Sequence, residues 1–220
     1  AHLGNMAAGK TERSPMNRTT HSAPLLIWLM ASCFAVGLWQ VWEGSWMYAK
    51  AGLARLLLQR AWTRSLEGEA MPKPWPWADT WPVARLQMPR LSVDLIVLAG
   101  AYGRTLAFGP GHVESSALPG QQGTTMLVGH RDTHFQFLKE VRMEDRLELI
   151  GADGTIRRYR VAEQRVMDSR RDSIATSHEG PELVLVTCFP FDAIMPGGPL
   201  RYVVRAEAIP QAERSRGASG

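Results

Sequence analysis

Leu183-Val184-Leu185-Val186-Thr187-Cys188 is the stretch of sequence that decides the fold. Its first four residues are all aliphatic, so both faces of an extended chain would be apolar at this point. A short run of this kind is typical of a central strand that is covered on both faces. Met126-Leu127-Val128 shows the same pattern upstream, and His130 follows it closely. We therefore expect two central strands that each end at a reactive side chain.

Short strand-forming segments alternate with turn signals around these two runs. The pattern predicts an all-β barrel or sandwich. Asp153-Gly154 supplies a hairpin turn, and residues 135–140 have the pattern of a short helix. The predicted strands lie at 85–89, 95–99, 125–128, 146–150, 157–166, 183–188 and 201–206.

Length and composition bound the architecture. A chain of 220 residues holds one domain with a sizeable core plus an appended segment. The net charge of +4 could suggest nucleic acid, but the charges nearly cancel between residues 72 and 206, and the surplus lies in the flanks. No nucleic-acid partner is therefore expected. The carboxylates lack a Ca²⁺-loop spacing and Cys188 has no cysteine near it, so we expect no metal and no cofactor.

Residues 22–42 carry no charge and are mostly apolar. A run of this length can cross the hydrocarbon core as a helix, which predicts a transmembrane signal anchor. Arg13 and Arg18 precede the run and Glu43 follows it, so the positive-inside tendency places the N-terminus in the cytoplasm. We expect a single-pass protein of the cytoplasmic (inner) membrane, with its folded domain on the periplasmic or extracytoplasmic side.

Two other interpretations of this segment stay open. Ala49-Lys50-Ala51 loosely fits a signal-peptidase site, although the apolar run is longer than a signal core. Met30-Ala31-Ser32-Cys33 resembles a lipobox, although strong hydrophobicity continues beyond it. A cleaved signal peptide and a lipid anchor are thus the alternatives to an uncleaved anchor.

The region between the anchor and the folded domain has two parts. Residues 48–66 place leucines among arginines, which predicts a helix that lies near the membrane or packs on the domain. The prolines of 71–77 predict an extended linker, and Trp75, Trp77 and Trp81 face a bilayer or plug a groove on the domain. The expected boundaries are a cytoplasmic, disordered N-terminus at 1–21, the anchor at 22–42, the membrane-proximal helix and linker at 43–81, the catalytic domain at 82–208 and a disordered tail at 209–220.

Cys188 is the only cysteine of the expected folded domain, because Cys33 lies in the anchor. An unpaired thiol in an exported domain calls for a reason, and reactivity is the obvious one. A thiol nucleophile needs a group that shares its proton and a donor that receives charge on the attacked carbonyl. The candidate bases are His112, His130, His134 and His178.

Position along the chain ranks these candidates. His130 is favoured because it follows an apolar strand, whereas His112 and His178 lie in loops punctuated by glycine and proline. Arg201 begins a strand and could offer forked donors to an oxyanion. Arg205, on the same strand face, is its alternative. A core thiol, a structural histidine and a surface arginine are the non-catalytic interpretations of the same residues.

Val186-Thr187-Cys188-Phe189-Pro190 followed by Arg201 resembles the signature of the sortase family. Arg201 follows Cys188 by thirteen residues and His130 precedes it by 58, both in the family's pattern. Gly129-His130-Arg131-Asp132 resembles the family's histidine motif, and the likeness covers about 85–207. His130-Arg-Asp-Thr-His-Phe135 and the stretch 190–201 resemble the sortases of Gram-negative bacteria (class GN), which tend to serve one dedicated substrate.

The resemblance implies an eight-stranded barrel with short helices that acts as a cysteine transpeptidase. Cys188 would attack the Thr carbonyl of a C-terminal Leu-Pro-x-Thr-Gly-like (LPXTG-like) sorting signal, His130 would act as acid and base, and Arg201 would steady the oxyanion. The implied partners are a secreted protein that bears this motif and an amine acceptor. Thr187 and Asp132 are candidate substrate-binding residues. Their alternatives are a buried strand threonine and a loop charge that is solvated or orients Arg131 or His130.

Three other functions compete with this one. An L,D-transpeptidase also uses Cys, His and Arg, but it carries a His-Gly pair before the cysteine, where this chain has Val186-Thr187. A hydrolytic cysteine peptidase would resolve the same thioester with water. A membrane-tethered, non-catalytic binding module would keep Cys188 as a core residue, and thiol labelling distinguishes it from an enzyme.

Overall fold

The computed structural model describes residues 22–176, 180–193, 195 and 197–210. The segment predicted at 1–21, most of the tail predicted at 209–220 and the candidate base His178 lie outside these residues. The chain divides into two compact units, Ala1–Ala49 and Lys50–Gly220. Helix α1, Ser22–Leu66, begins in the first unit and ends in the second.

Eight strands of the second unit close into a barrel in the order β1-β2-β3-β4-β7-β8-β6-β5. The predicted β-barrel is thereby confirmed, and each predicted strand overlaps an observed one. Strand β3 was not predicted, because its two residues leave no pattern in the sequence. The strands are β1 Pro82–Met88, β2 Val93–Ala99, β3 Gly111–His112, β4 Thr124–Val128, β5 Arg146–Gly151, β6 Ile156–Asp168, β7 Glu182–Cys188 and β8 Leu200–Ala208.

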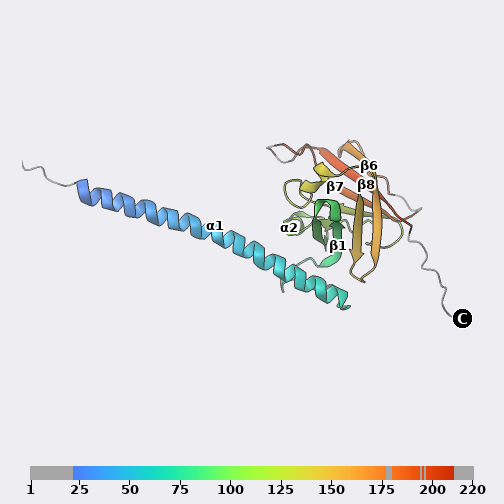
Figure 1. The fold of residues 1–220 in the computed structure, drawn as a ribbon, viewed down its shortest axis with the longest axis horizontal. Helices are drawn as coiled ribbons and strands as arrows, with labels where there is room; N and C mark the ends of the chain where they lie inside the picture. Colours follow the sequence, from blue (N-terminus) through green and yellow to red (C-terminus); the bar gives the residue numbers. More distant parts are fainter. Residues whose placement is uncertain (1–21, 177–179, 194, 196, 211–220) are drawn as a thin grey trace, which may run out of the picture. The chain divides into compact units, whose positions relative to one another are not determined.

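Strand β7 is central, as its apolar run predicts. Glu182 to Thr187 are all buried, and only Cys188 at the strand end is partly exposed. On one side β7 pairs in parallel with β4, and on the other it pairs antiparallel with β8. Figure 1 shows β6, β7 and β8 side by side in the barrel wall.

The barrel interior is filled by one large apolar cluster. It contains Leu86, Leu127, Phe135, Leu149 and Leu185, each at most 1% exposed. Strand β1 alternates buried and half-buried residues, as expected for a strand with one face toward this core. Close packing of this kind gives the strand ends fixed positions.

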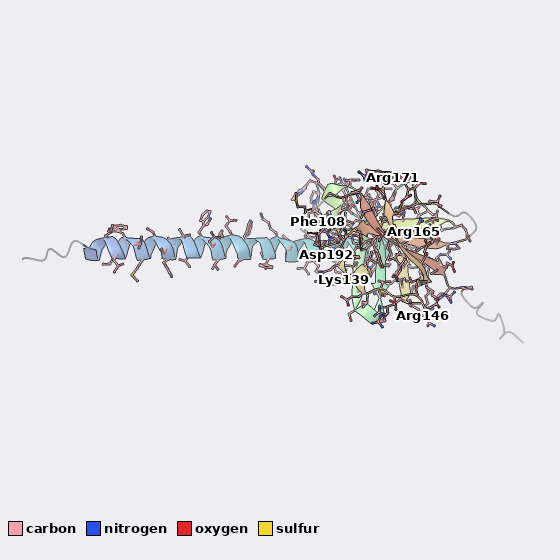
Figure 2. All side chains as sticks on the ribbon, turned by 90° about the horizontal axis from the view of Figure 1, so that it is seen from above. Phe108, Lys139, Arg146, Arg165, Arg171 and Asp192 are labelled. Atoms are coloured by element: carbon pink, nitrogen blue, oxygen red, sulfur yellow. The ribbon has the colours of Figure 1, made fainter. Side chains whose placement is uncertain are left out.

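Helix α1 joins the two helical segments predicted at 22–42 and 48–66 into one continuous helix. The reason is local, because no proline interrupts the segment and good helix formers dominate its second part. By length and composition α1 is able to cross a membrane. Side chains of its first part, such as Trp28 and Trp39, are exposed. Figure 2 shows side chains projecting from this part of the helix along its length.

The second part of α1 has a buried face. Leu58, Ala61, Trp62 and Ser65 are at most 6% exposed, and they recur at intervals of three or four residues. A helix cannot bury one of its own faces, so these side chains pack on the rest of the second unit. Residues 48–66 were expected either to lie near the membrane or to pack on the domain, and the second part of α1 packs on the domain.

The segment after α1 is also fixed to the barrel. The helix ends at Leu66, and Gly68 two residues later has a φ of +90°, which suits a left-handed cap. The Thr80 hydroxyl donates to the Ala99 carbonyl at 2.8 Å. Trp75 packs edge-on against Phe108, with ring centroids 4.9 Å apart, so Trp75 follows the predicted groove-filling alternative. Three short helices complete the unit: η1 Pro89–Leu91, α2 Gly103–Leu106 and η2 Gln136–Glu140, the last at the predicted site.

Candidate active site

The topology brings three strand ends to one edge of the barrel. Since β4 and β7 run in parallel, the loop after β4 and the end of β7 lie together. Since β8 is antiparallel to β7, its first residues lie beside the last residues of β7. These ends carry His130, Cys188 and Arg201.

The strand register sets the three residues level with one another. Cys188 is the direct partner of Arg201 in the β7–β8 ladder. In the β4–β7 ladder Val128 is the partner of Val186, and two further steps of that register bring His130 level with Cys188. The Gly129 amide donates to the Val186 carbonyl at 3.2 Å, so the ladder continues past the end of β4.

A tight turn holds His130 at this edge. The Phe135 amide donates to the His130 carbonyl at 3.0 Å, and the Phe135 ring is fully buried in the core. A Cβ atom on Gly129 would lie 2.7 Å from Cγ of that ring, so only glycine fits before the histidine. The His130 residue itself is exposed, so its imidazole can be reached from solvent.

The other described histidines are engaged elsewhere. His112 is 3% exposed, and its Nε2 atom lies 2.9 Å from the Ala117 carbonyl and 3.2 Å from the Ser116 hydroxyl. His134 is half-buried. Burial holds the pKa of His134 below its ordinary value and the nearby His130 lowers it further, against a hydrogen bond with the Ala107 backbone that raises it.

The two candidate arginines have different surroundings. Arg201 donates from Nη1 to the Gly198 and Leu200 carbonyls at 2.6 and 2.9 Å. Within the described part of the chain, its Nε and Nη2 atoms meet no hydrogen-bond acceptor, so they remain able to donate to an oxyanion. Arg205 is instead paired with Glu182 at 2.5 Å and with Glu163 at 3.3 Å.

The candidate substrate-binding residues contact the protein itself. The Thr187 hydroxyl is buried and donates to the Gly129 carbonyl at 2.8 Å, which favours the alternative of a buried strand threonine. Asp132 is exposed and accepts from Arg131 Nε at 2.8 Å. The Arg131 hydrogen bond, more than any other cause, holds the pKa of Asp132 below its ordinary value. Asp132 thus interacts with Arg131, one of the alternatives that the sequence left open.

The described residues contain no group of three or more His, Cys, Asp or Glu side chains placed to hold a metal ion. What gathers at this edge is a thiol, an imidazole and a guanidinium, a set suited to covalent acyl transfer. The family model described as a sortase domain matches residues 86–209. The chain belongs to the sortase family.

A curated sortase relative supports this membership. The chain is 32% identical over 125 residues to sortase D of Bacillus subtilis strain 168. The match covers 56% of this chain, and the chain spans 62% of the length of that relative.

Solved sortase structures share the barrel. Sortase C-1 from Actinomyces oris is 27% identical with a TM-score of 0.53, over 59% of this chain and 75% of that one. A sortase D5 transpeptidase from Clostridium perfringens is 22% identical with a TM-score of 0.52, over 69% of this chain and 89% of that one. At this identity the second likeness concerns the fold alone.

Two features near the site of this sortase barrel were not predicted from the sequence. Arg131, a charged residue in a loop, is only 6% exposed. An aromatic cluster of Phe189, Phe191 and Tyr202 surrounds the turn after Cys188, with ring centroids 5.2 to 6.1 Å apart. Burial raises the pKa of the Tyr202 phenol. The only sequence signal for the cluster is that an aromatic residue directly follows each of the two candidates: Phe189 follows Cys188, and Tyr202 follows Arg201.

Proposed function

We propose that this sortase is a cysteine transpeptidase that cleaves an LPXTG-like C-terminal sorting signal between Thr and Gly. It transfers the acyl group to an amine and so anchors a secreted protein at the cell surface. One observation carries the proposal most: Cys188 and Arg201 are direct partners in the ladder, and the His130 turn ends at the same edge.

The first step forms a thioester. The Cys188 sulfur attacks the Thr carbonyl carbon, and the negative charge that develops on the carbonyl oxygen is met by the Arg201 guanidinium. When the tetrahedral intermediate collapses, the C–N bond to Gly breaks and His130 gives a proton to the departing amine. Thr and the residues before it remain on Cys188.

The second step consumes the thioester. An acceptor amine attacks the same carbonyl carbon and loses its proton to His130, and Arg201 again meets the oxyanion. The C–S bond breaks, the thiolate is restored and a new amide is formed. Each step needs all three groups at one carbonyl, a requirement to which their common edge of the barrel is suited.

Membrane attachment is the second part of the proposal. We place the anchor at 22–42 with the N-terminus in the cytoplasm, because Arg13 and Arg18 precede it and Glu43 follows it. The barrel then faces the periplasmic or extracytoplasmic side, where an exported substrate is met. We extend the catalytic domain predicted at 82–208 back to Lys50, since the second compact unit includes the buried face of α1.

The subtype is the third part. His130-Arg-Asp-Thr-His-Phe135 and the Pro190 to Arg201 stretch are similar to the Gram-negative sortases, which favours a chain of class GN with one dedicated substrate. A gene for a secreted protein that ends in an LPXTG-like motif, an apolar helix and basic residues is expected nearby. Loss of surface display of that one protein on deletion of this gene tests the assignment.

Product analysis tests the reaction itself. The protein is incubated with Leu-Pro-x-Thr-Gly peptides, with and without added triglycine, and the products are identified by mass spectrometry. We expect the fragment that ends in Thr to be joined to triglycine, and we expect no cleavage with Cys188→Ala. Equal amounts of free acid in both incubations would instead favour the hydrolytic peptidase, because water would then resolve the thioester.

A further inference from the structure

Arg131 occupies an unusual place beside the proposed catalytic residues. It directly follows His130, yet its side chain is 6% exposed. Nη1 donates to the Pro190 carbonyl at 2.6 Å, and Nη2 donates to the Ala193 carbonyl at 2.8 Å. One guanidinium thus joins the turn after β4 to the turn after β7. The two turns are about 60 residues apart in the sequence, but one follows Cys188, the proposed nucleophile, and the other holds His130, the proposed acid and base.

The guanidinium is held in place from its own side as well. Asp132 accepts from Nε at 2.8 Å and from Nη2 at 3.3 Å. The neighbouring carboxylate thus fixes the orientation of the guanidinium plane whose Nη atoms contact the turn after β7. The pKa of Arg131 lies above its ordinary value, first because of the Asp132 hydrogen bond and further because of Coulombic interactions with Asp132, Cys188 and Asp192, while burial opposes the rise. Cys188 is therefore within electrostatic range of this buried cation.

The turn after Cys188 has a second support on its other side. The Phe189 amide donates to the Leu200 carbonyl at 3.0 Å, and Phe189 stacks on Tyr202. These contacts fix the start of the turn to β8, the strand that carries Arg201. Asp192, labelled in Figure 2, is exposed at its tip. Hydrogen bonds between Thr187 and Gly129 and between Gly129 and Val186 join the two strand ends. Beyond Cys188, Arg131 joins the turn itself to the His130 side, through the Pro190 and Ala193 carbonyls.

We infer that Arg131 is a positioning residue that sets the separation of the His130 imidazole and the Cys188 sulfur by clamping their two turns together. The inference rests on the proposed function only where it concerns turnover. A proton transfer between sulfur, substrate and imidazole requires hydrogen-bond distances. A displacement of about 1 Å costs on the order of 100-fold in rate, so a loose turn is enough to impair the reaction.

The matched control is Arg90. It too combines an Asp fork, to Asp145 at 2.6 Å, with a donation to a backbone carbonyl, that of Glu140 at 2.7 Å. Its contacts join η1 to the segment before β5 and include neither the His130 turn nor the Cys188 turn. Arg90→Ala therefore removes a similar set of bonds from the same barrel without touching the proposed clamp.

Hydrogen exchange tests the clamp without a substrate. In the full-length protein in detergent, Arg131→Ala is expected to speed exchange in 130–135 and 189–193, while β1 and β5 remain unchanged. Arg90→Ala is expected to speed exchange near 140–145 instead. Unchanged exchange at 189–193 in Arg131→Ala would overturn the clamp. If Arg131→Ala does not fold, Arg131→Lys, which keeps the charge but loses the planar fork, is measured in its place.

Kinetics test the positioning role. Arg131→Ala is expected to lower kcat about 100-fold with KM changed less than about threefold, because the substrate still binds but the acid/base group is displaced. Millimolar methylguanidinium, which can fill the space left by the Arg131 guanidinium, should restore part of the lost kcat in Arg131→Ala. It should not raise kcat in the control, Arg90→Ala. Faster exchange with wild-type kcat would overturn the positioning role. If the wild type turns over no peptide, the proposed function fails, and the exchange result still decides the clamp.

Discussion

Arg201 and Arg205 lie on the same face of β8, and their partners distinguish them. Arg201 is opposite Cys188 in the ladder, whereas Arg205 is opposite Val184, four residues earlier. Arg205 is also engaged by Glu182, which in turn accepts from the Thr124 hydroxyl at 2.8 Å. A charge that already bridges strands in this way stabilises the barrel rather than a passing oxyanion.

Arg201→Lys is therefore expected to lower kcat/KM by about two to three orders of magnitude, the typical loss for one oxyanion donor, because lysine keeps the charge but loses the planar fork. Arg205→Lys should leave kcat/KM within a few-fold and lower Tm instead. Steady-state kinetics on a fluorogenic sorting peptide and thermal melts of both variants provide the measurement. A larger kinetic loss at 205 than at 201 would contradict the assignment.

His134 makes a prediction about pH. Its folded pKa is depressed, mainly by burial, so the unfolded chain takes up the proton first as the pH falls. Its contribution to stability is complete above the unfolded value of about 6.5 and is lost as the pH falls from there toward the folded pKa.

We accordingly expect the Tm of the wild type to decrease as the pH is lowered from 7.5 to 5. The Tm of His134→Gln should decrease less over the same range. Circular dichroism melts of the two proteins in the same buffers give the comparison. Equal decreases would show that His134 does not contribute, and the acid sensitivity would then have to come from other groups.

The elements show how far the sequence could be read. Apolar runs and turn signals predicted the long strands, because period and composition are local properties. The two helical segments predicted at 22–42 and 48–66 form one helix. Its second part lies on the domain, which the sequence could not decide because a buried face and a membrane-facing stripe have the same period. Strand β3 has only two residues, which is too short for any pattern.

This difference changes where the chain can be cut. A protein that starts at Lys50 keeps Leu58, Ala61 and Trp62 and should be soluble with a single cooperative melt. A protein that starts at Met71 loses them and exposes the surface they cover, at about 1.5–3 kcal/mol for each large side chain. We expect a lower Tm and more aggregation for the shorter protein, as measured by circular dichroism and gel filtration. Equal Tm values would show that the helix contributes little.

On the scale of the whole molecule, the site is a product of topology. The candidates Cys188, His130 and Arg201 could each be named from the sequence because each lies near the end of a predicted strand, and the motif resemblance selected them among their alternatives. The sequence carries no comparable signal for Arg131, because its acceptors at Pro190 and Ala193 are backbone carbonyls and any residue type supplies those. Such a contact becomes visible only when the closed barrel places two distant turns together.

The central claim is that Cys188 carries the acyl group between two amines, and trapping of that intermediate tests it most directly. The protein is mixed with Leu-Pro-x-Thr-Gly peptides without an acceptor, quenched in acid and digested for mass spectrometry. We predict that the acyl group ending in Thr is found on Cys188, disappears when triglycine is added before the quench, and is absent from Cys188→Ala. An adduct that persists in Cys188→Ala, or no adduct on Cys188 from any of the peptides, would contradict the account.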